Sequence, residues 1–401
     1  MVAVITRIFG LSNIELAEDV VQDAFAQAIK DWTYQLPANP SAWLMQTAKN
    51  KTIDIIRRER HKKKFAEENA LLLKSEYTAA YTVENLFMPH EIKDSQLRMV
   101  FACCHPALEE RDQIALSLKT CSGFSIDEIA TALISNPEAI KKRIQRAKQY
   151  ITENNLQFNI PLGNELKKRL DVALHCIYLL FNEGYNSSNK EALIRRDLCD
   201  EALRLALMMT ENEFTNQPKC SALISLMSLL SSRFDARLDE HGEIVLLEDQ
   251  DRSKWDMELI NFGLEYLGRA STGDDLSEYH LEAAIVAEHS MAENFSETNW
   301  ERILDLYDML ARVNASPMVL LNRAIVIGKM EGSLKAIDVF LDIPEIDKLL
   351  RTHYLFAAAL GEFYKQANNK IESAKFFHQS FELTTSDLEK NLLKRKMKSV
   401  E

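Results

Sequence analysis

Apolar residues recur at helical spacing along most of the chain, most clearly between Phe124 and Ile151. One apolar set ends just before Ser135-Asn136. The next follows an i, i+4, i+7, i+11 pattern, so two helices joined by a tight turn are predicted. Asn136 is a favourable N-cap for the second helix, and Pro137 suits its first position. The two sets are Ile126, Ile129, Ala130 and Leu133, then Ile140, Ile144, Ala147 and Ile151.

The outward side of the second of these helices is basic, and no acidic residue follows Glu138 before Ile151. A short helix packed across a longer, basic and solvent-facing helix is the arrangement that enters a DNA major groove. A helical hairpin with a solvated basic surface is the alternative interpretation. The outward residues are Lys141, Lys142, Arg143, Gln145, Arg146 and Lys148.

Two longer amphipathic helices are predicted upstream, over residues 14–32 and about 41–60, separated by Pro37 and Pro40. The first has an acidic side that includes Asp19, Gln22 and Asp23, which is either solvated surface or a docking face for a basic partner helix. Its apolar side comprises Leu16, Val20, Phe25, Ala28 and Ile29. The second helix ends in a basic segment that complements the helix dipole.

From residue 161 onward the sequence is helical and acidic. Ala324 and Ala358 are 34 residues apart, the period of tetratricopeptide repeats, although Ala336 and Ala374 are 38 apart. With only 11 glycines and no sustained alternating strand pattern, the chain is predicted to be all-α, ending in a tetratricopeptide-like helical domain.

The net charge of −12 is unevenly distributed along the chain. Residues 1–160 hold 20 basic and 20 acidic side chains, and the remainder holds 28 basic and 40 acidic. Within the neutral part the basic residues cluster, first between Lys49 and Lys64 and again between Lys141 and Lys148. This distribution is typical of a DNA-binding segment joined to a distinct regulatory or partner module.

The six cysteines lie inside apolar helical segments without regular spacing, which predicts reduced, buried thiols in a cytoplasmic protein. Neither Cys103-Cys104-His105 nor the His280–His289 segment has the spacing of a metal site, so no metal or cofactor is expected. No signal peptide and no bilayer-spanning run is present.

Two stretches of the N-terminal part, AEDVVQDAF (Ala17–Phe25) and NPSAWLMQTAKNKTIDIIRRER (Asn39–Arg60), resemble region 2 of the extracytoplasmic-function sigma factors of the sigma-70 family. The helix-turn-helix from Phe124 resembles region 4 of the same family. The resemblance implies region 2 over residues 1–64, a linker over 65–94, region 4 over 95–155 and a helical extension over 161–401. Because VAVITRIF begins within an uncapped apolar pattern, we expect region 2 to be truncated at its N-terminus.

The resemblance also implies roles for particular residues. Asp19, Gln22 and Asp23 would dock on the β′ clamp helices of core RNA polymerase. Asn50 would contact an extruded base of the −10 element, since an amide can bond a base edge at two points. Region 4 would read the −35 element with Lys141, Lys142, Arg143 and Gln145, grip phosphates with Arg146 and Lys148, and contact the β flap. The implied region 2 phosphate contacts are Lys49, Lys51, Arg57 and Arg58.

The predicted function is therefore promoter-specific initiation without catalysis, because no phosphate loop, nucleophile–base pair or metal framework is present. The extension is expected to be regulatory, either by masking the basic surfaces or by holding a peptide or protein ligand. Two alternatives are a helix-turn-helix regulator with a tetratricopeptide-like sensor that does not bind polymerase, and a tetratricopeptide scaffold whose helix-turn-helix only packs.

Overall fold

The computed structural model describes residues 1–33, 35–59, 83–133, 135–156, 164–186, 194–213, 215–273 and 275–400. Over these ranges the protein is helical, and its one β pairing is an isolated bridge between Leu238 and Ile244. The all-α prediction is confirmed. Within the same ranges, no helix is both long enough and apolar enough to cross a bilayer.

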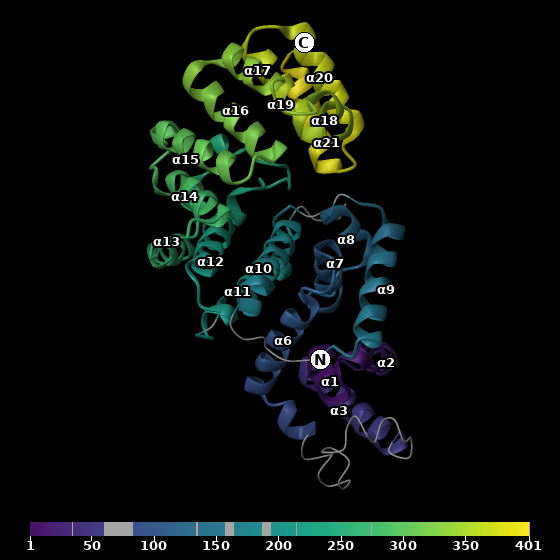
Figure 1. Ribbon diagram of the computed structural model, residues 1–401. Coiled ribbons are helices and arrows are strands. Elements are labelled where there is room, and N and C mark those ends of the chain that lie inside the picture. The colour runs from purple at the N-terminus through teal and green to yellow at the C-terminus, as the bar shows by residue number, and fades with distance from the viewer. Residues whose placement is uncertain are drawn as a thin grey trace. The chain divides into compact units, whose positions relative to one another are not determined.

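The chain forms two compact units, Met1–Leu180 and Phe181–Glu401 (Figure 1). The division falls inside a helix, α10, rather than at residue 161, where the extension was expected to begin. The first unit contains α1 (Val2–Phe9), the short 3-10 helix η1 (Leu11–Asn13), α2 (Ile14–Asp31), α3 (Pro40–Glu59), α6 (Pro89–Cys103), α7 (Glu110–Thr120), α8 (Ile126–Ala132), α9 (Pro137–Glu153) and most of α10 (Asn164–Tyr185).

The core of the first unit is built around α1, whose Ile5, Ile8 and Phe9 are almost completely buried against α2, α3 and α6. Arg7 on the opposite side of α1 donates to Glu91 at 2.7 Å and lies 2.9 Å from Asp94. Both acids belong to α6, which begins at Pro89, within the range expected as a linker. Residues 65–82 of that expected linker lie outside the described residues.

The helix-turn-helix forms as the sequence pattern predicts. Ser125 caps α8 through a capping box with Glu128, and Asn136 accepts from the Ala139 N–H at 2.8 Å to cap α9. The apolar stripe of α9 is buried, with Ile140, Ala147 and Ile151 at zero exposure. Caps and stripe together fix which side of α9 faces solvent.

The helix α10 belongs mainly to the first unit. Its Arg169 is buried and donates to the Phe101 carbonyl at 3.0 Å, while Leu170, Ala173 and Leu174 are buried in the same stretch. Residues 164–180 therefore pack in the first unit.

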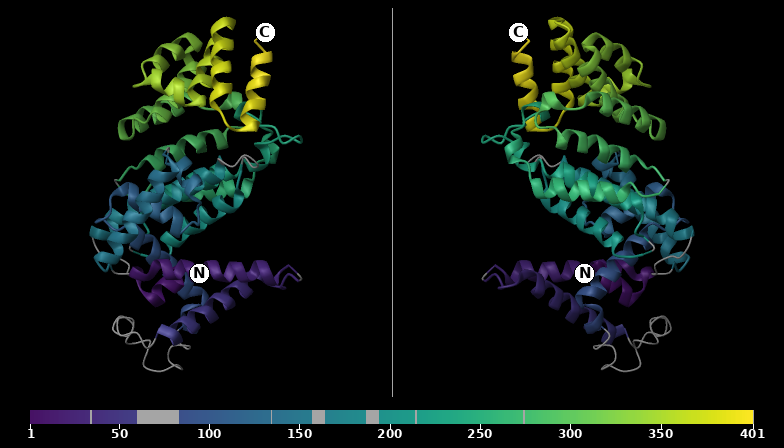
Figure 2. Two further views of the ribbon diagram at one scale, coloured as in Figure 1. Left: turned by 90° about the vertical axis from the view of Figure 1, so that its right-hand side faces the viewer. Right: turned by 90° about the vertical axis from the view of Figure 1, so that its left-hand side faces the viewer.

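The second unit is a series of helices that pack mostly on their sequence neighbours, seen as teal to yellow ribbons in Figure 2. They are α11 (Arg196–Thr210), α12 (Pro218–Ser231), α13 (Met257–Ala270), α14 (Glu278–Met291), α15 (Trp300–Val313), α16 (Pro317–Glu331), α17 (Ser333–Leu341), α18 (Ile346–Thr352), α19 (Tyr354–Gln366), α20 (Lys370–Leu383) and α21 (Asp387–Lys398). This hairpin packing is compatible with tetratricopeptide-like repeats, which stay a prediction.

Close helix pairing in the last hairpins depends on glycine. A Cβ built at Gly361 of α19 would lie 2.8 Å from the Phe377 ring of α20, and the buried Ser373 hydroxyl donates to the Gly361 carbonyl at 2.8 Å. A Cβ at Gly328 would lie 3.0 Å from Ala336. Glycines therefore allow the close approach of these helices.

All six cysteines are free thiols, and all but Cys121 are buried. Hydrogen bonding to Cys121, together with burial, raises the pKa of Cys103, which keeps that thiol protonated and unreactive. In the described ranges no cluster of three or more His, Cys, Asp or Glu side chains has the arrangement of a metal site. His280 instead hydrogen-bonds Ser277 and the Ala270 carbonyl.

Candidate DNA-binding and docking surfaces

The outer face of α9 presents three polar side chains to solvent, Lys141, Lys142 and Gln145. Arg143 beside them is half-buried. Because Asn136 and Pro137 start the helix and the apolar stripe anchors it, this face is held outward by the rest of the helix-turn-helix. Such a face has the chemistry for DNA: lysines for phosphates and an amide for base edges.

Arg146 occupies a different environment, although the sequence places it on the same helix. Its Nε and Nη2 atoms each donate to Asp112 at 2.7 Å, and Nη2 also reaches Glu109 at 3.3 Å. Asp112 belongs to α7 and is 2% exposed. Hydrogen bonding to Asp112 raises the pKa of Arg146, so its charge already serves to neutralise a buried carboxylate.

Lys148 is likewise engaged within the first unit. Its Nζ lies 2.6 Å from the Glu18 carboxylate on α2, and its side chain is only 14% exposed. Two further bonds support this contact: the Ser12 hydroxyl donates to Asn155 at 3.1 Å, and the Thr152 hydroxyl donates to the Ser12 carbonyl at 3.4 Å. The C-terminal end of α9 is thus packed on η1 and α2.

The predicted docking residues lie together on α2. Asp19, Gln22 and Asp23 are all exposed and fall on one side of the helix, while Val20 and Ala28 are buried on the other. Asp23 lies 3.5 Å from Lys51 of α3, which ties one end of this face to the neighbouring helix.

Two apolar residues of α2 do not follow the simple amphipathic interpretation. Phe25 is 43% exposed and Ile29 is 75% exposed, so neither belongs to the core side on which the sequence pattern placed them. They flank the face that carries Gln22 and Asp23. Helical periodicity alone therefore overestimated the core side of α2.

The predicted −10 residues are arranged along α3. Asn50 is exposed, and its Oδ1 accepts a hydrogen bond from the Gln46 amide at 2.9 Å. This bond does not use the two N–H donors of the Asn50 amide. Lys49 lies 3.6 Å from Glu84, Arg57 lies 3.5 Å from Asp54, and Arg58 is exposed. The remaining basic cluster, from Arg60 to Lys64, lies outside the described residues.

The structure therefore separates the predicted contacts into two groups. Exposed residues on α3 and α9 form two distinct surfaces, and Figure 1 shows α3 and α8 at opposite ends of the first unit. Arg146 and Lys148 instead hold α9 against α7 and α2. Glu18 and Asp112, which make this possible, were missed because an isolated acid in a helix gives no sequence sign of a distant partner.

Three parts of the chain match models of protein families. Residues 1–62 match the model of sigma-70 region 2, residues 98–151 match that of sigma-70 region 4, and residues 169–271 match a family of unknown function, DUF6596. The chain is also 34% identical over 375 residues to Uncharacterized protein R00370 of Rhizobium meliloti strain 1021, covering 93% of this chain and 87% of that protein.

The third match begins within α10, at residue 169, which is close to the division between the two units. The two sigma matches together cover the helices that carry the predicted docking and DNA-contact residues. The chain therefore belongs to the sigma-70 family, as a sigma factor that continues into a C-terminal helical domain.

Proposed function

We propose that this protein is an extracytoplasmic-function type sigma factor that binds core RNA polymerase through α2 and directs initiation at promoters read by α3 and α9. Its family membership supports promoter recognition; the docking and base-reading roles rest on the surfaces described above. In this proposal the second unit regulates the first, and the protein itself performs no catalysis.

The observation that carries the proposal is the composition of the exposed face of α2. Asp19 and Asp23 supply negative charge, while Phe25 and Ile29 supply exposed apolar area beside it. Charge complementarity speeds and orients the encounter of two proteins, and apolar anchors supply much of the affinity. A helix whose solvent side combines negative charge with exposed apolar residues is better suited to bind a protein partner than to remain exposed to water.

On the DNA side, the proposal assigns −35 readout to Lys141, Lys142, Arg143 and Gln145, and −10 readout to Asn50. Lys49, Lys51, Arg57 and Arg58 would contact the −10 backbone, and region 4 would also contact the β flap. Arg146 and Lys148 would reach phosphate only by leaving Asp112 and Glu18, so we expect them to contribute less to DNA affinity than Lys141 and Lys142.

The test is a pull-down with purified core polymerase followed by promoter-specific run-off transcription. We choose Asp19→Lys for the docking face, because Asp19 is exposed and no ion pair to it is found among the described residues, whereas Asp23 is coupled to Lys51. Asp338→Lys on α17 is the matched control, since it makes the same charge reversal at an exposed position of the second unit.

Asp19→Lys should abolish retention on polymerase and run-off transcription, and Asp338→Lys should preserve both. Retention equal to that of the unmodified protein would show that α2 is not the docking face. Failure of the unmodified protein to bind polymerase, with duplex binding intact, would favour a helix-turn-helix regulator instead.

A further inference from the structure

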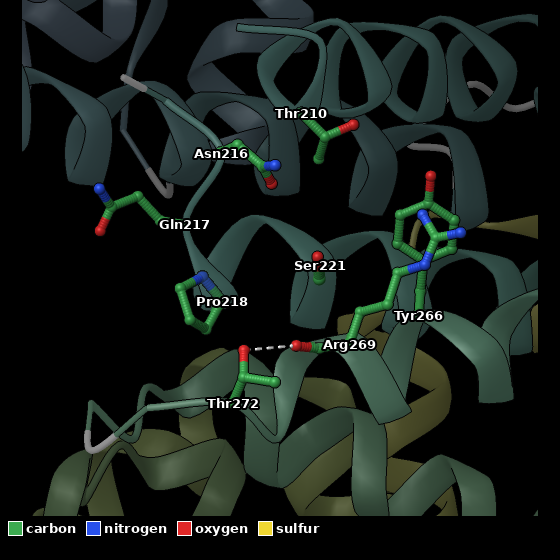
Figure 3. A pocket seen from close by; sticks show the side chains of 8 residues that line it. All are labelled: Thr210, Asn216, Gln217, Pro218, Ser221, Tyr266, Arg269 and Thr272. Carbon is green, nitrogen blue, oxygen red and sulfur yellow. Dashed lines mark hydrogen bonds between the residues drawn. The ribbon is translucent and has the colours of Figure 1, made fainter. Parts of the chain in front are cut away.

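The second unit contains a cavity that no sigma-factor role explains. It measures about 400 Å³ and lies where the C-terminal end of α11 meets the first turn of α12 and the C-terminal end of α13 (Figure 3). Among the described residues its lining side chains are mostly polar, and none of them is a carboxylate. The lining residues are Thr210, Asn216, Gln217, Pro218, Ser221, Tyr266, Arg269 and Thr272.

Ser221 is the residue that most clearly points to a ligand. It is only 6% exposed, yet among the described residues its hydroxyl has no hydrogen-bond partner, and Figure 3 shows that hydroxyl directed into the cavity. Another serine of the same helix, Ser228, donates to the Ile224 carbonyl at 2.8 Å, whereas the buried Ser225 hydroxyl has no partner among the described residues. The Ser221 hydroxyl differs from both because it opens onto the cavity, where a bound group can supply the hydrogen bond that the protein does not.

The start of α12 adds a favourable environment for negative charge. Gln217 is the N-cap residue but makes no side-chain capping bond, and Pro218 occupies the first position. The positive end of the α12 dipole is therefore not neutralised by a side-chain cap, and α12 has 14 residues. The Asn216 amide at the same end can donate to the same group, whereas Figure 3 shows the Gln217 amide directed away from Ser221 and Arg269.

Arg269 is the cationic side chain among the described lining residues. Its guanidinium carbon lies 4.5 Å from the centroid of the Tyr266 ring, and its Nη2 donates to Glu265 at 2.6 Å. These contacts hold the guanidinium over the ring while using only part of its five N–H donors. Glu265 does not line the cavity, so Arg269 is the charged side chain among the described lining residues. The Thr210 and Thr272 hydroxyls already donate to the Leu207 and Arg269 carbonyls.

We propose that this cavity binds a small molecule through an oxyanion group, either a phosphate monoester or a carboxylate. Arg269, the first turn of α12 and the Ser221 hydroxyl converge on that group, and Thr210, Tyr266 and Thr272 surround the remainder of the ligand. The proposal does not depend on polymerase binding, and it gives the second unit a ligand of defined chemistry.

The test is calorimetric titration of the full-length protein with three separate probes: inorganic phosphate, succinate and glucose. Saturable binding of phosphate or of succinate is expected and identifies which oxyanion is preferred, while glucose, which carries no charge, should not bind. A thermal unfolding midpoint that rises with the bound probe is the second readout.

Two variants locate the site. Arg269→Gln should weaken binding by at least about tenfold, because a charge-assisted contact is lost, and Ser221→Ala should weaken it by a few-fold without lowering the unfolding temperature. Arg312→Gln, which removes an exposed arginine from α15, is the matched control and should bind normally.

Absence of saturable binding by both anions, or equal weakening in all three variants, would overturn the proposal. Circular dichroism of each variant shows whether it is folded. Ser221→Ala keeps the test decisive if Arg269→Gln does not fold, because it removes no hydrogen bond that the protein itself makes.

Discussion

At the scale of single residues, the first unit shows how a basic side chain on α9, the helix proposed to read DNA, can serve the fold. Asp112 is almost completely buried, and two of its hydrogen bonds come from Arg146. A buried carboxylate is tolerated when it is paired and hydrogen-bonded, and it becomes costly when its partner is removed.

Arg146→Gln is therefore expected to destabilise the first unit, by about 1–2 kcal/mol, since Asp112 loses its cation while Arg146 itself is 59% exposed. Chemical denaturation of the variant measures this. The double variant Arg146→Gln/Asp112→Asn should recover part of the loss. A variant of unchanged stability with strongly reduced DNA affinity would show that Arg146 acts on DNA after all.

His289 gives a residue-scale prediction about pH. Burial, together with Arg233 and Arg252, lowers the pKa of His289 to about 4. Below an unfolded pKa of about 6.5 the unfolded chain binds a proton that the folded chain does not, so stability falls as pH decreases from about 6.5 toward 4. Above about 6.5 both states are neutral and the contribution is constant.

His289→Gln should flatten this dependence, so the unfolding temperature of the variant should drop less between pH 7 and pH 5 than that of the unmodified protein. Removing the whole pKa shift of His289 would change the free energy of unfolding by roughly 3 kcal/mol at most. His353→Gln, at a half-buried histidine on the α18–α19 junction, is a control that should retain the normal slope. Identical slopes for His289→Gln and the unmodified protein would contradict the assignment.

At the scale of elements, the most informative helix is α10. It was assigned to the extension on composition, yet residues 164–180 pack in the first unit, with Leu170 and Leu174 buried and Arg169 bonded to α6. A boundary placed at 161 would expose the face of α6 that α10 covers.

A fragment of residues 1–186 should accordingly be folded and more stable than a fragment of residues 1–160. The loss expected for the shorter one is several kcal/mol, since each buried leucine contributes about 1.5–3 kcal/mol. Thermal denaturation followed by circular dichroism compares the two. Equal midpoints would mean that α10 is dispensable for the first unit.

The contact between α2 and α9 can be measured by a double-mutant cycle. Glu18→Ala and Lys148→Ala should show a coupling energy of about 0.5–1 kcal/mol, because both side chains are largely covered. The pair Gln27→Ala and Lys148→Ala, with Gln27 elsewhere on α2, serves as the control and should show no coupling. A zero coupling for Glu18 and Lys148 would mean that other contacts hold α9 in place.

The helices were predictable because their signals lie close together in the sequence, whereas contacts between distant helices leave no such signal. The caps at Ser125 and Asn136 and the stripe of α9 depend on residues within two turns, so the helix-turn-helix was predictable in detail. The partners of Arg146 and Lys148 lie in other helices, and the close approach at Gly361 depends on a ring in α20. Periodicity gives the face of a helix but not which helix covers it.

At the scale of the whole molecule, the distribution of charge matters most. Residues 1–186 hold 23 basic and 23 acidic side chains, so the net charge of −12 is carried entirely by residues 187–401. This strongly negative part of the chain disfavours the approach of any polyanion. Salt screens the repulsion, with a screening length of about 10 Å at 0.1 M.

We therefore expect the fragment 1–186 to bind random-sequence duplex DNA more tightly than the full chain at low salt, with the difference shrinking as salt rises. Fluorescence anisotropy titrations at two salt concentrations measure it. Equal affinities at low salt would show that the acidic module does not oppose DNA binding.

The ion pair between Glu18 and Lys148 also affects how many ions the protein exchanges with DNA. A free lysine that neutralises a phosphate displaces a condensed cation, and each such event steepens the logarithmic salt dependence by about 0.9. Lys148 would leave a carboxylate behind, and that carboxylate attracts a cation in its turn, so its transfer to phosphate releases almost none. The number of cations released by the α9 contacts alone should thus fall below the number of basic residues on α9, by one for Lys148 and by one more for Arg146.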